Sequence, residues 1–487
     1  MSVREPRAPA GLLRLFACAA AVGTCAAGLG GCATGPDYVK PATDLPVSWK
    51  LEAPWRVGQP DDAAAKGPWW QRFGDAQLNA LQTQAQANNP TLALAGTRLA
   101  QARATLAGST AGLFPQIGVS ERAARQRISA NRPLSNYNSA NFSTLQNDVV
   151  LQGTVSYEVD LAGRVARSIE AGQAALAQSA ADFENTRLLL SADLASAYFN
   201  LRATDVELDV LARSLALQGR ALGLVQARRA GGAGTGLEVA QQQALLDSTR
   251  VQLDLLKRQR GVFEHAIAAL VGVPAPAFSL AVDLRPLQPP VVPLGVPSDV
   301  LERRPDIAAA ERAMAVANAQ IGVARAAFYP SIALGGAFGV ESRALSALFD
   351  APSLLWSLGL SAAQVLFDGG RVRATVDFAS AAHAGTVANY RRVVLGAMQE
   401  VEDGITGLNA LDSAAAQAAT AVASARQVLT MSTARYEGGA STYADVIIAQ
   451  QALLVAERQA AQLLGQRLLT TVFLVKALGG DWSAAQG

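Results

Sequence analysis

The sequence has few histidines and cysteines, which supply many metal sites and enzyme active sites. It contains two histidines, His265 and His383, and each lies in a helical pattern with no second His or Cys at ligand spacing. Its three cysteines, at positions 18, 25 and 32, leave the rest of the chain without an internal disulfide. No P-loop or nucleophile elbow is present. We therefore expect no enzyme, no metal site and no bound cofactor.

An excess of charge is missing as well, and so is proline over two long stretches. The 41 basic and 39 acidic residues leave a formal net charge of only +2, so nothing points to nucleic acid as a partner. There is no proline between Pro133 and Pro274, and none after Pro352. Because proline breaks the interior of a helix, these stretches permit long helices.

The first residues have the pattern of a bacterial export signal. Three arginines precede an apolar run over 15–27, which is too short for a membrane-spanning helix. The sequence Leu-Gly-Gly-Cys at 29–32 resembles the bacterial lipobox, in which the cysteine is lipidated and becomes the first residue of the mature chain. We therefore predict a signal peptide over 1–31 and a lipid on Cys32. Plain cleavage beside an incidental cysteine is the alternative.

The rest of the chain contains a repeated pattern. Landmarks of the first half recur in the same order at an offset of about 207 residues, the separation of Arg164 and Arg371. The clearest landmarks are Gly163-Arg164-Val165 with Gly370-Arg371-Val372, and Gly231-Gly232-Ala233 with Gly438-Gly439-Ala440. We interpret the pattern as a duplicated unit. The resulting segments are an extended lipidated segment over 32–73, repeat 1 over 74–275, a proline-rich linker over 276–297, repeat 2 over 298–480 and a C-terminal tail over 481–487.

Each repeat is expected to contain a long helical hairpin. Residues 163–230 are rich in good helix formers, with leucines at three- and four-residue steps. At 1.5 Å per residue such a helix is roughly 100 Å long. A glycine-rich turn at 231–234 then leads into a second helical pattern. The predicted hairpins cover 163–272 and 370–478.

Two segments in each repeat alternate between apolar and small or polar residues, which is the periodicity of a strand. The predicted strands lie at about 115–128, 148–161, 330–341 and 353–367. Strands of this length can cross an outer membrane, but single-chain barrels start at about eight strands. If the strands span a membrane, the chain must form an oligomer, such as a dimer or a trimer. A soluble sandwich is the alternative, and it would leave the long helices without a place to pack.

Five motifs are spread over the mature chain. They read CATGPDY at 32–38, LERRPDI at 301–307, ANAQIGVARAAFYPSI at 317–332, LFDGGR at 366–371 and ALGGDW at 477–482. In combination they resemble the signature of the outer-membrane efflux proteins, the TolC-like family. More narrowly, the chain resembles the outer-membrane lipoproteins of RND-type tripartite pumps, the NodT-type subfamily.

The resemblance implies a membrane β-barrel that continues into a long α-helical barrel. It implies a homotrimer, with a twelve-stranded barrel in the outer membrane and a twelve-helix tunnel in the periplasm. Such a trimer is the exit duct of a tripartite pump, and it passively conducts drugs or other small toxic compounds from an inner-membrane RND pump and a periplasmic adaptor. A type I secretion or metal-efflux component is an alternative, and so is a non-conducting envelope coiled-coil lipoprotein.

The lipid implied by the resemblance anchors the chain at the inner leaflet of the outer membrane. Ala33 follows Cys32, where an aspartate favours inner-membrane retention in the resembled lipoproteins. The joins between strands and helices are expected near the membrane surface. Glycine tolerates the backbone angles of such a join, and basic side chains can snorkel beside it. The join residues are Gly163, Arg164, Gly370 and Arg371.

The helical turns are expected to form periplasmic tips that meet the adaptor, through Gly231, Gly232, Gly438, Gly439 and Ala440. In the resembled channels, the helix after the second tip carries acidic residues that face the pore, and the two matching positions here are Asp445 and Ile448. We expect Asp445 to set cation preference and Ile448 to form an apolar constriction. Tyr436 and Gln451 are expected to hold neighbouring helices together. The alternative is that Ile448 only packs between helices.

Overall fold

The computed structural model describes residues 34–39, 67–127, 145–290 and 303–480. The chain forms two compact units, which we call the strand unit and the helical unit. Their segments are Met1–Pro41, Gln101–Ala177 and Arg312–Ala388 for the strand unit, and Ala42–Ala100, Gln178–Glu311 and Asn389–Gly487 for the helical unit. Each unit takes segments from both predicted repeats, because the long helices begin in one unit and continue in the other.

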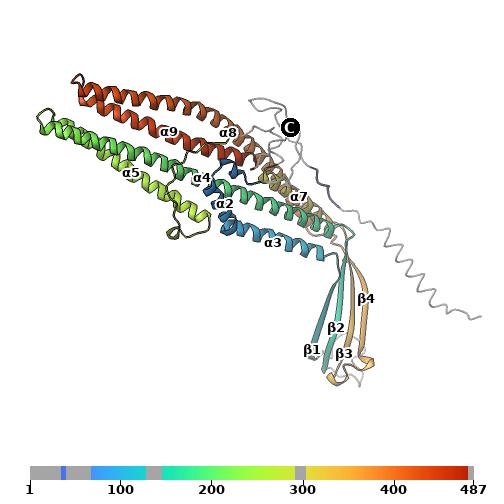
Figure 1. Cartoon of the computed structure of the whole chain (residues 1–487). Helices are drawn as coiled ribbons and strands as arrows, with labels where there is room; N and C mark the ends of the chain where they lie inside the picture. The colour runs from blue at the N-terminus through green and yellow to red at the C-terminus, as the bar shows by residue number, and fades with distance from the viewer. Residues whose placement is uncertain (1–33, 40–66, 128–144, 291–302, 481–487) are drawn as a thin grey trace, which may run out of the picture. The chain divides into compact units, whose positions relative to one another are not determined.

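The same order of elements occurs in both halves of the chain (Figure 1). After η1 (Trp69–Phe73) and α2 (Ala76–Asn88), the first half has α3 (Pro90–Ala111), β1 (Gln116–Arg127), β2 (Leu145–Val159), α4 (Arg164–Ala230) and α5 (Gly236–Leu270). The second half has α7 (Pro305–Ala326), β3 (Ser331–Ser342), β4 (Leu354–Ala363), α8 (Arg371–Glu437) and α9 (Tyr443–Ala477). Helices α4 and α8 each contain 67 residues, and α5 and α9 each contain 35. Within the described ranges, no helix has the length and apolar composition needed to cross a membrane.

The strand unit contains one antiparallel sheet in the order β1-β2-β3-β4. Its register places apolar residues together on one face, for example Ile117 opposite Val155 and Phe338 opposite Trp356. Phe338 and Trp356 are both largely exposed. Among the strands that the structure describes, β1 and β4 each have a neighbour on one side only. The sheet therefore offers an uncovered apolar face and two free edges, and free edges of this kind readily pair with another chain.

Strand β4 ends at Ala363, earlier than the predicted 367, although three apolar residues, Val365 to Phe367, follow Gln364. The reason lies in its partner strand. Ala363 pairs with Ser331, the first residue of β3, and the residue before Ser331 is Pro330. Because proline has no N–H to donate to the ladder, β3 cannot extend backwards to pair with the residues after Ala363.

Aromatic and aliphatic side chains from η1, α2, α4, α5 and α9 form the main core of the helical unit. Trp69, Phe199, Ile267 and Leu468 are fully or almost fully buried there. Burying a large apolar side chain stabilises a fold by roughly 1.5–3 kcal/mol. The helices are therefore held side by side mainly by apolar packing.

One hydrogen bond occurs in equivalent places in both halves of this unit. Asn89, just before the proline that starts α3, donates from Nδ2 to the carbonyl oxygen of Leu270 at 2.8 Å. Arg304, just before the proline that starts α7, donates from Nη1 to the carbonyl oxygen of Ala477 at 3.0 Å. Leu270 and Ala477 are the last residues of α5 and α9. Each bond satisfies a carbonyl that the end of a helix leaves without an intrahelical partner.

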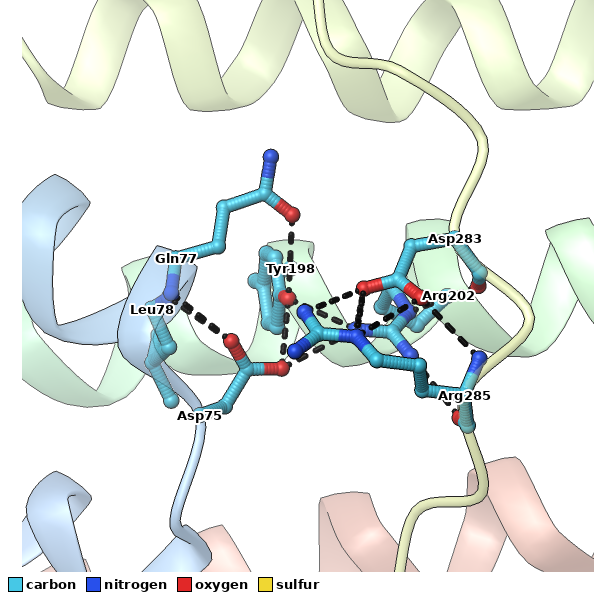
Figure 2. A network of polar contacts seen from close by, with 7 residues as sticks. All are labelled: Asp75, Gln77, Leu78, Tyr198, Arg202, Asp283 and Arg285. Carbon is cyan, nitrogen blue, oxygen red and sulfur yellow. Dashed lines mark hydrogen bonds and ion pairs between the residues drawn. The ribbon is translucent and has the colours of Figure 1, made fainter.

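A buried polar network lies beside the core (Figure 2). Arg202 on α4 forms ion pairs with Asp75 at 2.9 Å and Asp283 at 3.0 Å. Its guanidinium also donates to the carbonyl oxygens of Asp283 and Arg285. Tyr198, one turn earlier, donates to Asp75, which caps the start of α2, and burial raises the pKa of this tyrosine. The network therefore ties α2, α4 and the segment after η3 (Ala275–Ala277) together.

Candidate functional site

The first strand-to-helix join is held by Asp160 and Gly163. The carboxylate oxygens of Asp160 accept hydrogen bonds from two N–H groups in the first turn of α4, at 3.0 and 2.7 Å. Gly163 has a φ of 74°, in the left-handed region that favours glycine. Arg164 donates from Nε and Nη2 to Glu158, at 2.8 and 2.6 Å. The arginine predicted at this join is therefore paired with the end of β2.

The second join uses the same chemistry with one residue fewer. Asp368 accepts from the N–H groups of Gly370 and Val372, both at 2.9 Å. Gly369 and Gly370 both have positive φ, and Arg371 is exposed at the start of α8. Sequence reasoning found the glycines and arginines of the joins. It missed the capping role of the aspartates, although an aspartate stands shortly before the Gly-Arg-Val sequence in both halves.

The two helical turns have the same geometry. The N–H groups of Gly232 and the residue after it donate to carbonyls in the last turn of α4, and those of Gly439 and Ala440 donate to the last turn of α8, at 2.8–3.0 Å. Gly232 and Gly439 have φ of 77° and 74°, which is typical of a residue that ends a helix. All the predicted tip residues, including Gly231 and Gly438, are exposed. The turns are therefore accessible in the single chain.

Each return helix starts with a carboxylate that caps it. Glu238 accepts from the N–H of Thr235 at 2.9 Å, and the threonine hydroxyl accepts from the N–H of Glu238. At the start of α9, Asp445 Oδ2 accepts from the N–H and the hydroxyl of Thr442, at 3.1 and 3.0 Å. One oxygen of the predicted gate residue Asp445 is therefore engaged in a helix cap.

A buried cluster near the turns joins the two hairpins. Tyr436 at the end of α8 packs against Tyr443 at the start of α9, with ring centroids 4.9 Å apart. The Arg228 guanidinium of α4 lies 4.7 Å from the centre of the Tyr436 ring, as in a cation–π contact. Val225 and Val446 are buried in the same cluster. Tyr436 thus contacts both α4 and α9 within one chain.

Two buried glutamines extend this cluster. The Tyr443 hydroxyl donates to Gln242 Oε1 at 2.8 Å, and burial raises the pKa of Tyr443 to about 12. Gln242 Nε2 donates to the Gln218 carbonyl at 3.0 Å and lies 3.4 Å from Gln450 Oε1. The glutamine that α9 contributes is therefore Gln450, whereas the predicted Gln451 is exposed. The Gln-Gln-Ala-Leu-Leu sequence at 242–246 and 450–454 was the available signal for this pair.

Asp445 and Ile448 lie three residues apart on α9, and both are exposed. Residues at this spacing share one face of a helix. The side chain of Ile448 is 63% exposed, so it does not pack between helices of its own chain. The pair is therefore available to a pore or to another chain.

The predicted lipid acceptor Cys32 lies outside the described residues. Thr34, two residues later, donates from its N–H at 3.3 Å and from its hydroxyl at 2.8 Å to the carbonyl oxygen of Ala162, beside the first join. In the part of the chain that the structure describes, no group of three or more His, Cys, Asp or Glu side chains is placed to hold a metal ion.

Comparison with known proteins points to one family. The sequence model of the outer membrane efflux protein family matches residues 81–273 and 296–480. The pyoverdine export outer membrane protein OpmQ of Pseudomonas putida is 32% identical, over 85% of this chain and 88% of that protein. The toluene efflux pump outer membrane protein TtgF of Pseudomonas putida is 33% identical, over 92% and 93%. The solved outer-membrane channel OprN superposes with a TM-score of 0.82 at 28% identity, over 93% of this chain and 100% of that chain.

Proposed function

Since the chain belongs to the outer membrane efflux protein family, we propose that it is the outer-membrane exit channel of a tripartite RND-type efflux pump. The observation that carries the proposal is the open sheet, with one apolar face and two free edges, on a chain that also forms long helical hairpins. The names of the two relatives refer to pyoverdine and toluene. We propose that this channel likewise passes small organic compounds, including drugs, and that it does so passively.

A homotrimer satisfies the free edges of the sheet. Neighbouring strands in the order β1-β2-β3-β4 are antiparallel, so β4 of one copy can pair antiparallel with β1 of the next. Three copies, the number implied by the family resemblance, give a closed barrel of twelve strands, and even strand numbers are usual for such barrels. Helices α4, α5, α8 and α9 of three copies supply the twelve helices of the periplasmic tunnel.

The apolar face of the sheet suits contact with lipid, and the joins suit the membrane surface. Outer-membrane barrels present an apolar band to the bilayer and a more polar face to the interior. The carboxylates and arginines of the joins, Asp160, Arg164, Asp368 and Arg371, would then lie in the aqueous boundary. A lipid on Cys32 adds a second anchor, which places the chain in the outer membrane with its helices in the periplasm.

The two turns are the proposed contact with the periplasmic adaptor. Gly232 and Gly439 carry no side chain, and a Cβ added to either would meet nothing within 4 Å. A helical hairpin of another protein can therefore approach the backbone closely at both tips. The equal geometry of the two tips offers two similar docking places in each subunit.

The proposed gate is the exposed pair on α9. Three Asp445 carboxylates around one axis would attract cations, and three Ile448 side chains would form an apolar ring that closes by dewetting. The buried cluster of Tyr436, Tyr443 and Gln242 supports this gate, because it fixes the start of α9 against the first hairpin.

An efflux assay in the native cell tests the proposed function. Deleting the gene should increase the retention of ethidium, a fluorescent efflux substrate, and re-expression should restore the low level. Replacing Leu358 and Leu360 with aspartate places charges on the apolar face, and this variant should not restore efflux. Retention that is unchanged by deletion, or restored equally by the aspartate variant, would contradict the proposal.

A further inference from the structure

The first described residues form a strap that is docked on the strand unit. Besides the two hydrogen bonds from Thr34 to the Ala162 carbonyl, the strap is held by α7. Asn318 Nδ2 donates to the carbonyl oxygen of Pro36 at 2.9 Å. The strap, which we define as Thr34–Asp37, therefore contacts α7 and the first strand-to-helix join at the same time.

The strap lies in a notch formed by Arg167, Asn318 and Gly322. Arg167, in the first turn of α4, is at its centre. Its side chain is only 6% exposed. The guanidinium donates to the carbonyl oxygens of Thr34 and Gly35, both at 3.3 Å, and to the carboxylate of Asp37 at 3.0 Å. It also pairs with Glu170 at 2.6 Å. A buried guanidinium has several donors in a fixed geometry, so it selects a peptide that presents acceptors at matching positions.

Two glycines make room for the strap. A Cβ added to Gly322 of α7 would lie 2.8 Å from Arg167 Cγ and 2.9 Å from the carbonyl oxygen of Thr34. A Cβ added to Gly35 would lie 2.7 Å from Gly322 Cα, and the φ of Gly35 is 108°. All three distances are shorter than non-bonded heavy atoms tolerate, and the backbone angle of Gly35 favours glycine. The close approach of the strap to α7 therefore depends on glycine on both sides.

We propose that the notch formed by Arg167, Asn318 and Gly322 is a docking site for the mature N-terminus, and that docking fixes where the lipid of Cys32 meets the membrane. The second half of this proposal rests on the lipidation proposed above. Two residues of extended chain span at most roughly 7 Å, so docking of Thr34 would limit how far the lipid can lie from the join of β2 and α4. Docking in the notch would therefore hold the lipid of each subunit at one position beside the barrel.

Spin-label distances test the docking in the full-length protein. After residues 1–31 are removed, Cys32 is the only native cysteine. In the proposed lipoprotein its thiol carries the lipid and is not available to the label. Cysteines introduced at Val39 and Arg325, both exposed, are then the only labelling sites. Labelled subunits are diluted with unlabelled ones, so that only the distance between the two labels of one subunit is measured. We expect this distance to have one narrow distribution. Arg167→Ala and Gly322→Ala should each broaden it, while mass spectrometry still shows the lipid. Gly385→Ala is the matched control, because an added Cβ there meets nothing within 4 Å, and it should leave the distribution narrow.

A chain without the lipid shows whether docking of the strap depends on lipidation. Cys32→Ser, exported behind a signal peptide that is cleaved without lipidation, should keep the narrow distribution, because no described contact of the strap involves Cys32. A narrow distribution in both Arg167→Ala and Gly322→Ala, or a broad one in Cys32→Ser, would overturn the docking site. A wild-type mature chain without lipid would overturn the anchoring half alone, and the channel and efflux measurements would still report on the proposed function.

Discussion

At the residue scale, Arg202 faces two carboxylates and almost no water (Figure 2). Arg202→Ala would leave the buried Asp75 without its cation, while Asp283 would keep its pair with Arg285. Removing one partner of a buried pair costs about 3–5 kcal/mol. We expect a clearly lower midpoint temperature when helix content is followed by circular dichroism. Arg285→Ala is the control, because Arg285 also pairs with Asp283 but its side chain is 67% exposed. An equal fall of the midpoint temperature in both variants would contradict the claim that the buried pair of Arg202 stabilises the helical unit more than the exposed pair of Arg285.

Asp283 should make the stability of the helical unit depend on pH. Hydrogen bonds from the Arg285 side chain hold the pKa of Asp283 at about 2, below its ordinary 3.8. Because the folded pKa is lower, the stabilisation by the charged form is complete above pH 3.8 and is lost as the pH falls through about 2. The gap in midpoint temperature between wild type and Asp283→Asn should therefore narrow from about pH 5 to about pH 2. A constant gap would show that the charge does not contribute.

Asp445 combines a helix cap with a proposed charge at the pore, and the two roles can be separated. Asp445→Asn keeps an oxygen that can accept from Thr442 but removes the charge. We expect the trimer to remain intact and its cation preference to weaken, so that the reversal potential in a KCl gradient moves toward zero. Glu238→Gln, at the equivalent cap of α5, shows whether the first half contributes to the same ring. An unchanged reversal potential in Asp445→Asn would place the selectivity elsewhere.

The partners of the buried polar residues, in the core and in the candidate site, were not revealed by the sequence. Gln242, Gln450 and Arg202 are ordinary residues of a helical pattern, and their partners are distant in sequence. Their local spacing does not distinguish them from solvent-exposed residues, although the repeated Gln-Gln-Ala-Leu-Leu sequence marked Gln242 and Gln450 as equivalent positions. The capping boxes were visible, since Thr235 and Thr442 are each followed three residues later by an acid.

At the scale of elements, the second turn makes the proposed adaptor contact testable without backbone strain. Ala440 is exposed and its substitution avoids the left-handed glycine next to it. Ala440→Trp should abolish efflux by blocking the approach of the adaptor, while size-exclusion chromatography still shows the trimer. Ala344→Trp, exposed in the connection between β3 and β4, should leave efflux unchanged. Full efflux in Ala440→Trp would show that this tip is only a turn.

The positions of helices and strands could largely be read from the sequence. Period-two alternation marked the strands, and the absence of proline together with glycine pairs marked the hairpins and their turns. The end of β4 was predicted too late, because the predicted strand includes the apolar Val365 to Phe367 although Gln364 interrupts the alternation. The partner strand begins only after Pro330. A strand ends where its partner ends, and the partner is set by tertiary structure.

At the scale of the whole molecule, the order of elements and the family were both accessible from the sequence. The motifs between 301 and 332 and around 366–371 suggested the family, and the match over both halves of the chain confirms it. The compact units were not accessible, because each combines segments from both halves. Repeats are found by similarity along the chain, whereas units depend on which segments pack together.

Single-channel conductance in a planar lipid bilayer tests the central claim most directly. Purified wild-type trimer should give small, discrete conductance steps, and Ile448→Ala should give larger ones, because the apolar constriction is removed. The Leu358→Asp, Leu360→Asp variant is the control and should give no steps, because it cannot insert its apolar face. A trimer that inserts into the bilayer but conducts in neither the wild type nor Ile448→Ala would contradict the assignment of this chain as an exit channel.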